Sequence, residues 1–265
     1  PAMKKPLREQ AVEYLQYLKE QGVTHVPSSG KKFAKRPPAS PPPAPAPSAP
    51  AKPPAKPKEP EVRFAARVSL TPPKGGKDTL ESIAAEIAAC QLCALAPTRK
   101  HVVPGQGALK PEVMFIGEGP GADEDEQGLA FVGRAGQLLT KMINAMGYTR
   151  EQVFIGNIVK CRPPGNRVPT PEEMAGCIPY LKRQIAVIQP KLIVCLGATA
   201  ARGLVNETLP IGKARGSWRE FEGIPVMLTF HPAYLLRDPR QKAPCWSDLK
   251  AVLARLGKTP PGKDA

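Results

Sequence analysis

The chain has 265 residues, 34 of them proline, and a formal net charge of +15 at pH 7. One compact domain of this size carries far fewer prolines, so part of the chain is expected to lie outside a packed core. No run of eighteen apolar residues is present, and no charged segment leads into a short apolar one. These features argue against a membrane span and a secretory signal, and we expect a cytoplasmic protein.

Residues 1–25 predict one short amphipathic helix. Leu7, Leu15 and Leu18 recur at helical spacing, and Gly22 follows them. Such a helix either packs on its own domain or docks on a protein partner, and the sequence leaves both uses open.

Residues 26–77 form a linker rich in Pro, Ala and Lys, which includes KRPPASPPPAPAPSAPAKPPAKPKEP. The tract lacks the apolar periodicity that could offset the entropy of ordering it, so we expect it to be disordered. Residues 1–75 hold 14 Lys/Arg against 5 Asp/Glu and contribute +9 of the net charge. This tail either attracts a polyanion such as DNA, with a strong dependence on salt, or serves as a solubilising spacer.

Residues 78–257 alternate apolar runs with helical patterns, and residues 258–265 form a short tail. We expect strands at 113–118, 153–160, 192–197 and 225–232, and helices near 79–90, 134–147, 171–188, 198–205 and 244–256. Continuous apolar strands separated by helices predict a three-layer α/β/α fold around a mostly parallel, four-stranded sheet. Ligands of such sheets bind at the carboxyl ends of the strands, where Glu118, Asn157 and His231 lie.

Four of the six cysteines are candidates for metal binding: Cys90, Cys93, Cys161 and Cys177. In a chain without a secretory signal, cysteines favour metal or redox chemistry over a disulfide framework. Four thiolates suit either structural zinc or an iron-sulfur cluster. Because the third and fourth cysteines lie on separate elements and not in a second close pair, we favour a [4Fe-4S] cluster. Cys195 and Cys245 are expected to be small apolar core residues.

The segment GEGPGADEDEQGLAFVGRAGQLL follows the first strand. A glycine turn in this place can bind phosphate, but no Lys-Ser/Thr of a P-loop follows, and the acidic row would repel phosphate. We expect a pocket for a neutral planar ligand instead, with Phe131 as a stacking face. A lone phenylalanine is more often a core residue, Asn157 could form a turn instead of reading a base edge, and His231 could be a surface residue before Pro232.

Together these segments resemble family 4 of the uracil-DNA glycosylase superfamily, its iron-sulfur branch in bacteria and archaea. The resemblance covers about residues 78–257. It rests on GEGPGADEDEQG, FVGRAGQLL, NIVKCRPPGNR, HPAYLLRDP and the four cysteines in the family's order. Family members commonly have Ala or Gln in place of Gly119, a departure that changes little because the family uses the backbone amide there.

The resemblance implies a DNA repair enzyme that flips uracil out of single- or double-stranded DNA and hydrolyses its N-glycosidic bond, leaving an abasic site. It implies that Phe131 stacks on the uracil and that Asn157 pairs with its N3 and O4 edge. The Gly119 amide and His231 would hold O2, where negative charge develops. Glu124 would lie near C5 and exclude the methyl group of thymine.

The same resemblance assigns the four cysteines to a [4Fe-4S] cluster and implies a monomer. Arg134 is expected to contact phosphate, and Leu235 and Leu236 to form an apolar wedge with Arg237 near the DNA backbone. For the carboxylate that orients the attacking water we choose Glu118. Asp123 and Glu124 remain alternatives.

Two other functions compete with this one. The branch called family X crosslinks covalently to uracil-containing DNA and carries a basic loop with a histidine, of the type KRRIH, before the last cysteine. The corresponding segment here, CRPPGNRVPTPEEMAGC, contains no histidine. A metal-stabilised nucleic-acid-binding module without catalysis would explain the tail and the cysteines, but it gives Phe131, Asn157 and His231 no purpose.

Overall fold

The structure, a computed structural model, describes residues 78–262. The N-terminal helix and the linker expected at 1–77 lie outside the described residues, as do residues 263–265. No helix in the described part of the chain is long and apolar enough to cross a membrane.

The described residues form one mixed sheet of six strands, in the order β1-β3-β2-β4-β6-β5. The strands are β1 (Gln106–Gly107), β2 (Val113–Gly117), β3 (Phe154–Asn157), β4 (Leu192–Leu196), β5 (Trp218–Phe221) and β6 (Ile224–Thr229). The four central strands run parallel, whereas β1 and β5 pair antiparallel at the two edges. The four parallel strands expected from the sequence are therefore confirmed. The expected total of four strands was wrong, because the sheet also contains β1 and β5.

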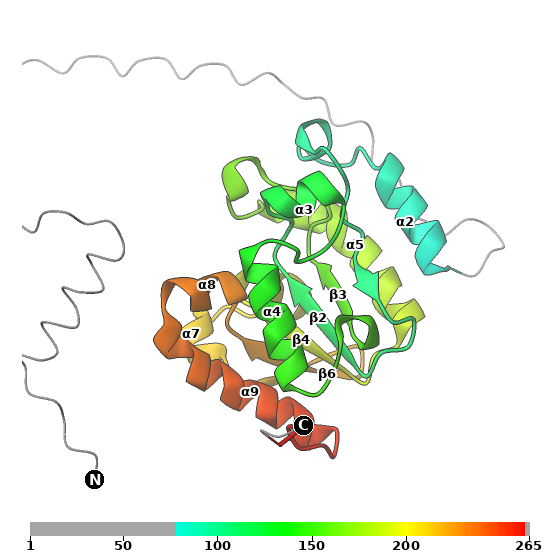
Figure 1. Cartoon of the computed structure of the whole chain (residues 1–265). Helices are drawn as coiled ribbons and strands as arrows, with labels where there is room; N and C mark the ends of the chain where they lie inside the picture. Colours follow the sequence, from blue (N-terminus) through cyan, green and yellow to red (C-terminus); the bar gives the residue numbers. More distant parts are fainter. Residues whose placement is uncertain (1–77, 263–265) are drawn as a thin grey trace, which may run out of the picture. The chain divides into compact units, whose positions relative to one another are not determined.

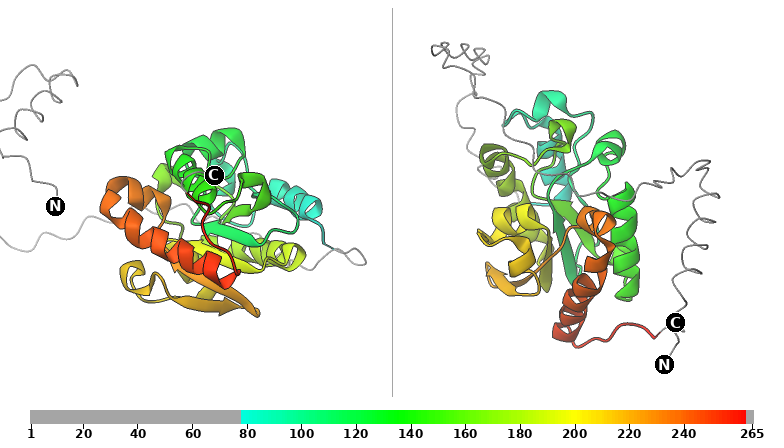
Figure 2. Two further views of the ribbon diagram at one scale, coloured as in Figure 1. Left: turned by 60° about the horizontal axis from the view of Figure 1, so that its bottom comes forward. Right: turned by 90° about the vertical axis from the view of Figure 1, so that its left-hand side faces the viewer.

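Helices cover both faces of the sheet (Figures 1 and 2). The α-helices are α2 (Leu80–Ala89), α3 (Ala122–Gln127), α4 (Arg134–Ala145), α5 (Pro171–Ile188), α6 (Ala198–Val205), α7 (Ile211–Ala214), α8 (Pro232–Arg237) and α9 (Lys242–Arg255). Short 3₁₀ turns lie at Ala96–Thr98, Arg150–Gln152, Pro164–Asn166 and Pro239–Gln241. The long helices agree closely with the expected ranges.

Alternating residues of β2 belong to two different cores. Met114 and Ile116 pack with α2, α5 and α6, whereas Val113 and Phe115 pack with α4 and α9. All five residues of β2 are buried. A strand buried on both faces has to be apolar throughout, which is why its sequence shows no alternation of polar and apolar residues.

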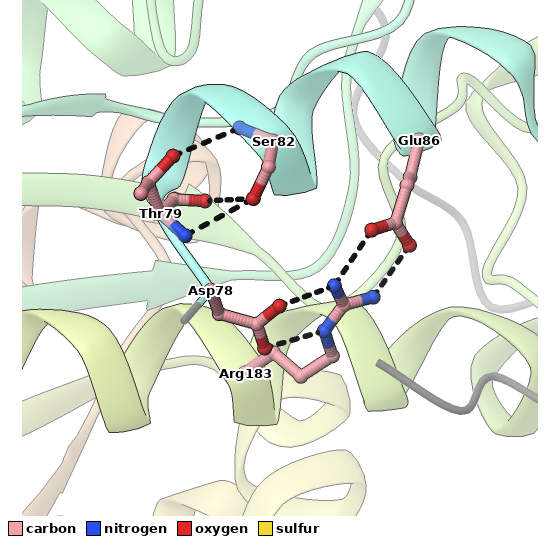
Figure 3. Close-up of polar contacts among 5 residues, drawn as sticks. All are labelled: Asp78, Thr79, Ser82, Glu86 and Arg183. Carbon is pink, nitrogen blue, oxygen red and sulfur yellow. Dashed lines mark hydrogen bonds and ion pairs between the residues drawn. The ribbon is translucent and has the colours of Figure 1, made fainter. Parts of the chain in front are cut away.

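An arginine clamp joins α2 to α5 (Figure 3). Arg183 of α5 donates two hydrogen bonds to the carboxylate of Asp78, at 2.7 and 2.8 Å, and two to that of Glu86, at 2.6 and 2.7 Å. Its side chain is only 13% exposed, and such paired contacts fix geometry as well as adding energy. The clamp matters for the metal candidates because α2 leads into Cys90 and α5 carries Cys177.

Candidate active site

A cleft opens at the carboxyl ends of the parallel strands. Glu118 follows β2, Asn157 ends β3, Gly197 follows β4, and His231 lies two residues beyond β6. All four line one cleft of about 840 Å³. Ligand sites of about 300–1,000 Å³ take groups the size of a nucleobase or larger. Parallel strand order therefore brings together residues that lie far apart in the chain.

Phe131 lines this cleft in a strained backbone conformation. Its φ of 53° lies in the left-handed region, which is unfavourable for a bulky residue. Arg150 holds the loop in place, because its guanidinium group donates to the carbonyl oxygens of Phe131 and Ala130, at 3.0 and 2.7 Å. Gly136 lets α4 approach the loop, since a Cβ there would lie 1.9 Å from the Phe131 carbonyl oxygen. This use of Arg150 was not predicted from the sequence.

Asn157 presents an unpaired oxygen beside the Phe131 ring. The residue is 1% exposed, and its Oδ1 has no hydrogen-bond partner among residues 78–262. A Cβ at Gly117 would lie 2.5 Å from both Asn157 Oδ1 and Phe131 Cζ, so only glycine leaves room for the pair. A buried polar atom without a partner is costly. Asn157 Oδ1 is therefore a candidate acceptor for an N–H group of a ligand.

The imidazole ring of His231 is neutral, and its single proton lies on a defined nitrogen. It caps the N-terminus of α8, where its Nδ1 accepts a hydrogen bond of 3.1 Å from the amide of Ala233. Enclosure by the protein lowers the pKa of His231 to about 4, and the nearby charge of Arg237 acts in the same direction. The single proton of the neutral ring is thus on Nε2, which can donate. The ring centroid lies 5.7 Å from that of Phe131.

Glu118 is oriented by a residue that the sequence did not point to. Thr199, in the first turn of α6, donates a hydrogen bond to Glu118 Oε2. The other carboxylate oxygen of Glu118, Oε1, is not bound by Thr199. Gly119 lines the same cleft, and a Cβ there would lie 2.7 Å from Val159 Cγ2. A larger residue at this position would need the Val159 side chain to shift.

Glu124 organises the loop that carries Phe131. Its Oε1 accepts hydrogen bonds of 2.9 Å from the amides of both Val132 and Gly133, and its Oε2 accepts one of 3.1 Å from Gly121. Because both oxygens are engaged by the backbone, the side chain forms a fixed part of the cleft wall. These contacts leave Glu124 poorly suited to orient a water molecule.

The rest of the acidic row serves mainly to anchor the chain. Asp125 is buried and accepts hydrogen bonds from the amides of Lys100 and His101, at 2.9 and 3.4 Å. Glu126 forms an exposed ion pair with Lys100. Asp123 alone lies exposed at the cleft. The acidic row is therefore largely structural, which the sequence did not reveal.

Residues expected to contact DNA lie at the rim of the cleft, with one exception. Arg134 is the first residue of α4, and Arg237 the last of α8, and both line the cleft. Leu236 is 42% exposed and also lines it, but Leu235 is 1% exposed and packs in the core beside Phe230. The expected pair of wedge residues is thus reduced to Leu236, because successive residues of a helix point to different sides.

The four candidate cysteines line one small cavity that is separate from the cleft. Cys90 ends α2, Cys93 follows in the next turn, Cys161 follows β3, and Cys177 lies in α5. Burial raises the pKa of the Cys177 thiol to about 12. Elsewhere, Cys195 and Cys245 are buried among apolar residues, as expected.

Two basic residues border the cysteine cavity. Arg99 donates to the Sγ of Cys161 at 3.4 Å, and the backbone amide of Lys160 donates to the Sγ of Cys177 at 3.2 Å. Burial lowers the pKa of Lys160 to about 8, opposed by Cys177. Across residues 78–262, no group of three or more Cys, His, Asp or Glu side chains is drawn closely enough together to hold a single metal ion. A donor set of four thiols with cationic neighbours fits an anionic multi-iron cluster.

Comparison with known proteins identifies the family. Residues 104–250 match the family model of the Uracil DNA glycosylase superfamily. The chain is similar to the type-4 uracil-DNA glycosylases of Archaeoglobus fulgidus, at 43% identity over 69% of this chain and 96% of the relative, and of Thermotoga maritima, at 46% over 61% and 85%. A third, from Sulfurisphaera tokodaii, is 44% identical over 66% of this chain and 84% of its own length. The chain therefore belongs to the uracil-DNA glycosylase superfamily and groups with its type-4 members.

Proposed function

We propose that this protein removes uracil from DNA by hydrolysing the N-glycosidic bond, as a base excision repair enzyme. The observation that carries the proposal is the convergence of Phe131, Asn157 and His231 on one cleft, in a chain of the uracil-DNA glycosylase superfamily. A base inside a duplex is out of reach of such a cleft, so the nucleotide has to be flipped out first. We expect single-stranded and double-stranded DNA both to be substrates.

Recognition of uracil rests on stacking and on one base edge. Phe131 stacks on the flipped ring, held ready by Arg150. The Oδ1 of Asn157 accepts a hydrogen bond from uracil N3–H, and its amide nitrogen donates to O4. Thymine differs from uracil by a methyl group on C5, and we assign its exclusion to the wall formed by Glu124. The three backbone contacts of that carboxylate make the wall rigid.

Bond cleavage is assisted where negative charge develops. As C1′–N1 breaks, its electron pair leaves with uracil and charge accumulates on O2. The Nε2–H of His231 and the amide of Gly119 donate to that oxygen, and donors fixed in advance stabilise the transition state more than the bound substrate. The sugar becomes positively charged, and water adds to C1′. Glu118, oriented by Thr199, accepts the proton of that water.

Contacts with the DNA backbone are assigned to the rim of the cleft. Arg134 and the free amides at the start of α4 bind phosphate. Arg237, at the end of α8, lies near the DNA backbone. Leu236 fills the space that the flipped base leaves in the stack.

The cysteine cavity is proposed to hold a [4Fe-4S] cluster on Cys90, Cys93, Cys161 and Cys177. The four thiols line one cavity, and the spread of the third and fourth cysteines over separate elements is our reason for choosing a cluster over zinc. The cluster would supply a covalent link between α2, the turn after β3, and α5.

Residues 78–257 are proposed to be the catalytic unit, because the family match and the whole cleft fall within them. Action as a monomer is part of the proposal. We assign the basic residues before 78 to nonspecific attraction of DNA, and the activity to the cytoplasm, where bacterial and archaeal DNA lies.

The proposal is tested by incubating the purified protein with a duplex that contains one uracil and then treating the DNA with alkali, which breaks strands at abasic sites. We expect one break at the uracil and none in the matched duplex with thymine. Covalent attachment of the protein to the DNA, without release of an abasic product, would support family X instead. Binding without any break would support a non-catalytic module.

A further inference from the structure

A short segment joins the cleft to the cysteine cavity. Asn157 at its start lines the cleft, and Cys161 at its end lines the cavity. The amides of the two residues after Asn157 donate to carbonyl oxygens at the end of β2, at 3.0 and 3.1 Å. The segment is thus fixed against the sheet, and its two ends cannot move independently over so few residues.

Lys160 is the residue of this segment that contacts both sites. The residue borders the cysteine cavity, and its side chain is fully buried. The ammonium group donates to the backbone carbonyl oxygen of Asn157 at 3.0 Å. Its backbone amide donates to the Sγ of Cys177 at 3.2 Å. One residue therefore holds the backbone of a base-pocket residue and a sulfur of the cysteine set.

The buried ammonium group needs a negative charge nearby. Within the described range, no carboxylate forms an ion pair with Lys160. Burying a charge without compensation is costly, and proteins rarely retain it. Four cysteines that bind iron do so as thiolates, and the resulting cluster carries net negative charge. The cavity that Lys160 borders is where that charge would lie.

We propose that Lys160 couples the iron-sulfur site to uracil recognition as a positioning residue. The negative charge of the thiolate-bound cluster holds the ammonium group, which in turn fixes the backbone of Asn157 at the base edge. The inference rests on the proposed function and deepens it: the cluster then sets the geometry of the base pocket, besides linking helices. Because energetic coupling is reciprocal, a base held by Asn157 must also affect the cluster.

The test is Lys160→Met, which removes the ammonium group and keeps a similar volume. Lys182→Met is the matched control, because Lys182 is exposed on the same helix as Cys177 and the change in charge is identical. We expect Lys160→Met to retain iron, to show a more negative reduction potential of the cluster because a nearby positive charge is lost, and to excise uracil at least about tenfold more slowly in a single turnover. Lys182→Met should match the wild type in all three measurements.

A normal excision rate in Lys160→Met, or a slower rate with an unchanged reduction potential, would overturn the coupling. Loss of iron with excision retained would also overturn it. If Lys160→Met does not fold, the coupling is tested in the wild-type protein instead. Free uracil should then shift the reduction potential of the cluster in the wild type but not in Asn157→Ala. The absence of any shift would contradict the proposal. A wild type that removes no uracil refutes the proposed function itself, so the two failures are distinguishable.

Discussion

Replacing His231 by alanine removes one of the two donors assigned to uracil O2. The structure places the single proton of this neutral ring on Nε2, because Nδ1 accepts from Ala233 and the pKa is lowered to about 4. Loss of one fixed donor to a developing oxyanion costs about 10²- to 10³-fold in rate, or about 3–4 kcal/mol. We expect His231→Ala near the lower end of this range, since the Gly119 amide still donates.

Binding should change much less than rate, because O2 gains its charge only as the bond breaks. The assay is single-turnover excision at saturating enzyme, with affinity measured by fluorescence anisotropy on uracil DNA that carries a 2′-fluorine to prevent cleavage. His101→Ala deletes the same side chain outside the cleft and is the control. Loss of the N-cap contact at His231 costs about 1 kcal/mol of stability, which should not unfold the protein. A rate within about threefold of the wild type, or equal losses in rate and affinity, would refute this role.

Four further results are expected. The pKa of His231 is about 4 in the folded protein against 6.5 ordinarily, so the wild type should lose up to about 3 kcal/mol of stability as pH falls from 6.5 to 4. Denaturant unfolding at pH 7 and pH 4.5 should show a smaller loss in His231→Ala, and equal losses would argue against the lowered pKa of this ring. Glu124→Ala removes the acceptor of three backbone amides. It should lower the free energy of unfolding by about 2 kcal/mol and allow some excision of thymine. Unchanged thermal unfolding and unchanged selectivity would show that the loop does not need this carboxylate. The purified protein should be brown, with broad absorbance near about 400 nm, whereas one zinc per chain and negligible iron would exclude the cluster. Deleting residues 1–75 should preserve excision and flatten the salt dependence of DNA binding, and a folded truncated protein without excision would place those residues in the catalytic unit.

The central strands could be predicted because burial on both faces leaves a direct trace in the sequence. VMFIG and LIVCL are apolar throughout, as β2 and β4 require. The edge strands left no such trace. β1 has only two residues, and β5 reads WREF with three of its four residues not buried, a pattern that many surface segments share.

Candidate site residues could be predicted where they lie at the end of a strand, as Asn157 does, or just beyond it, as His231 does, because the sheet itself determines where strand ends lie. The residues that hold other site residues in place were not predicted. Arg150 reaches back 19 positions to Phe131, and Thr199 contacts Glu118 across 81 positions. Such contacts depend on how helices pack against the sheet, and no spacing within one segment encodes them.

The most direct test of the account compares three duplexes that differ only in one base, uracil, thymine or cytosine, with the wild-type protein and with Asn157→Ala. The rate of abasic-site formation is the quantity measured. We expect the wild type to release uracil and to leave thymine and cytosine in place, and Asn157→Ala to lose most uracil excision while keeping its fold and its iron. Uracil excision that is unchanged in Asn157→Ala, or wild-type release of all three bases at similar rates, would contradict recognition at this cleft.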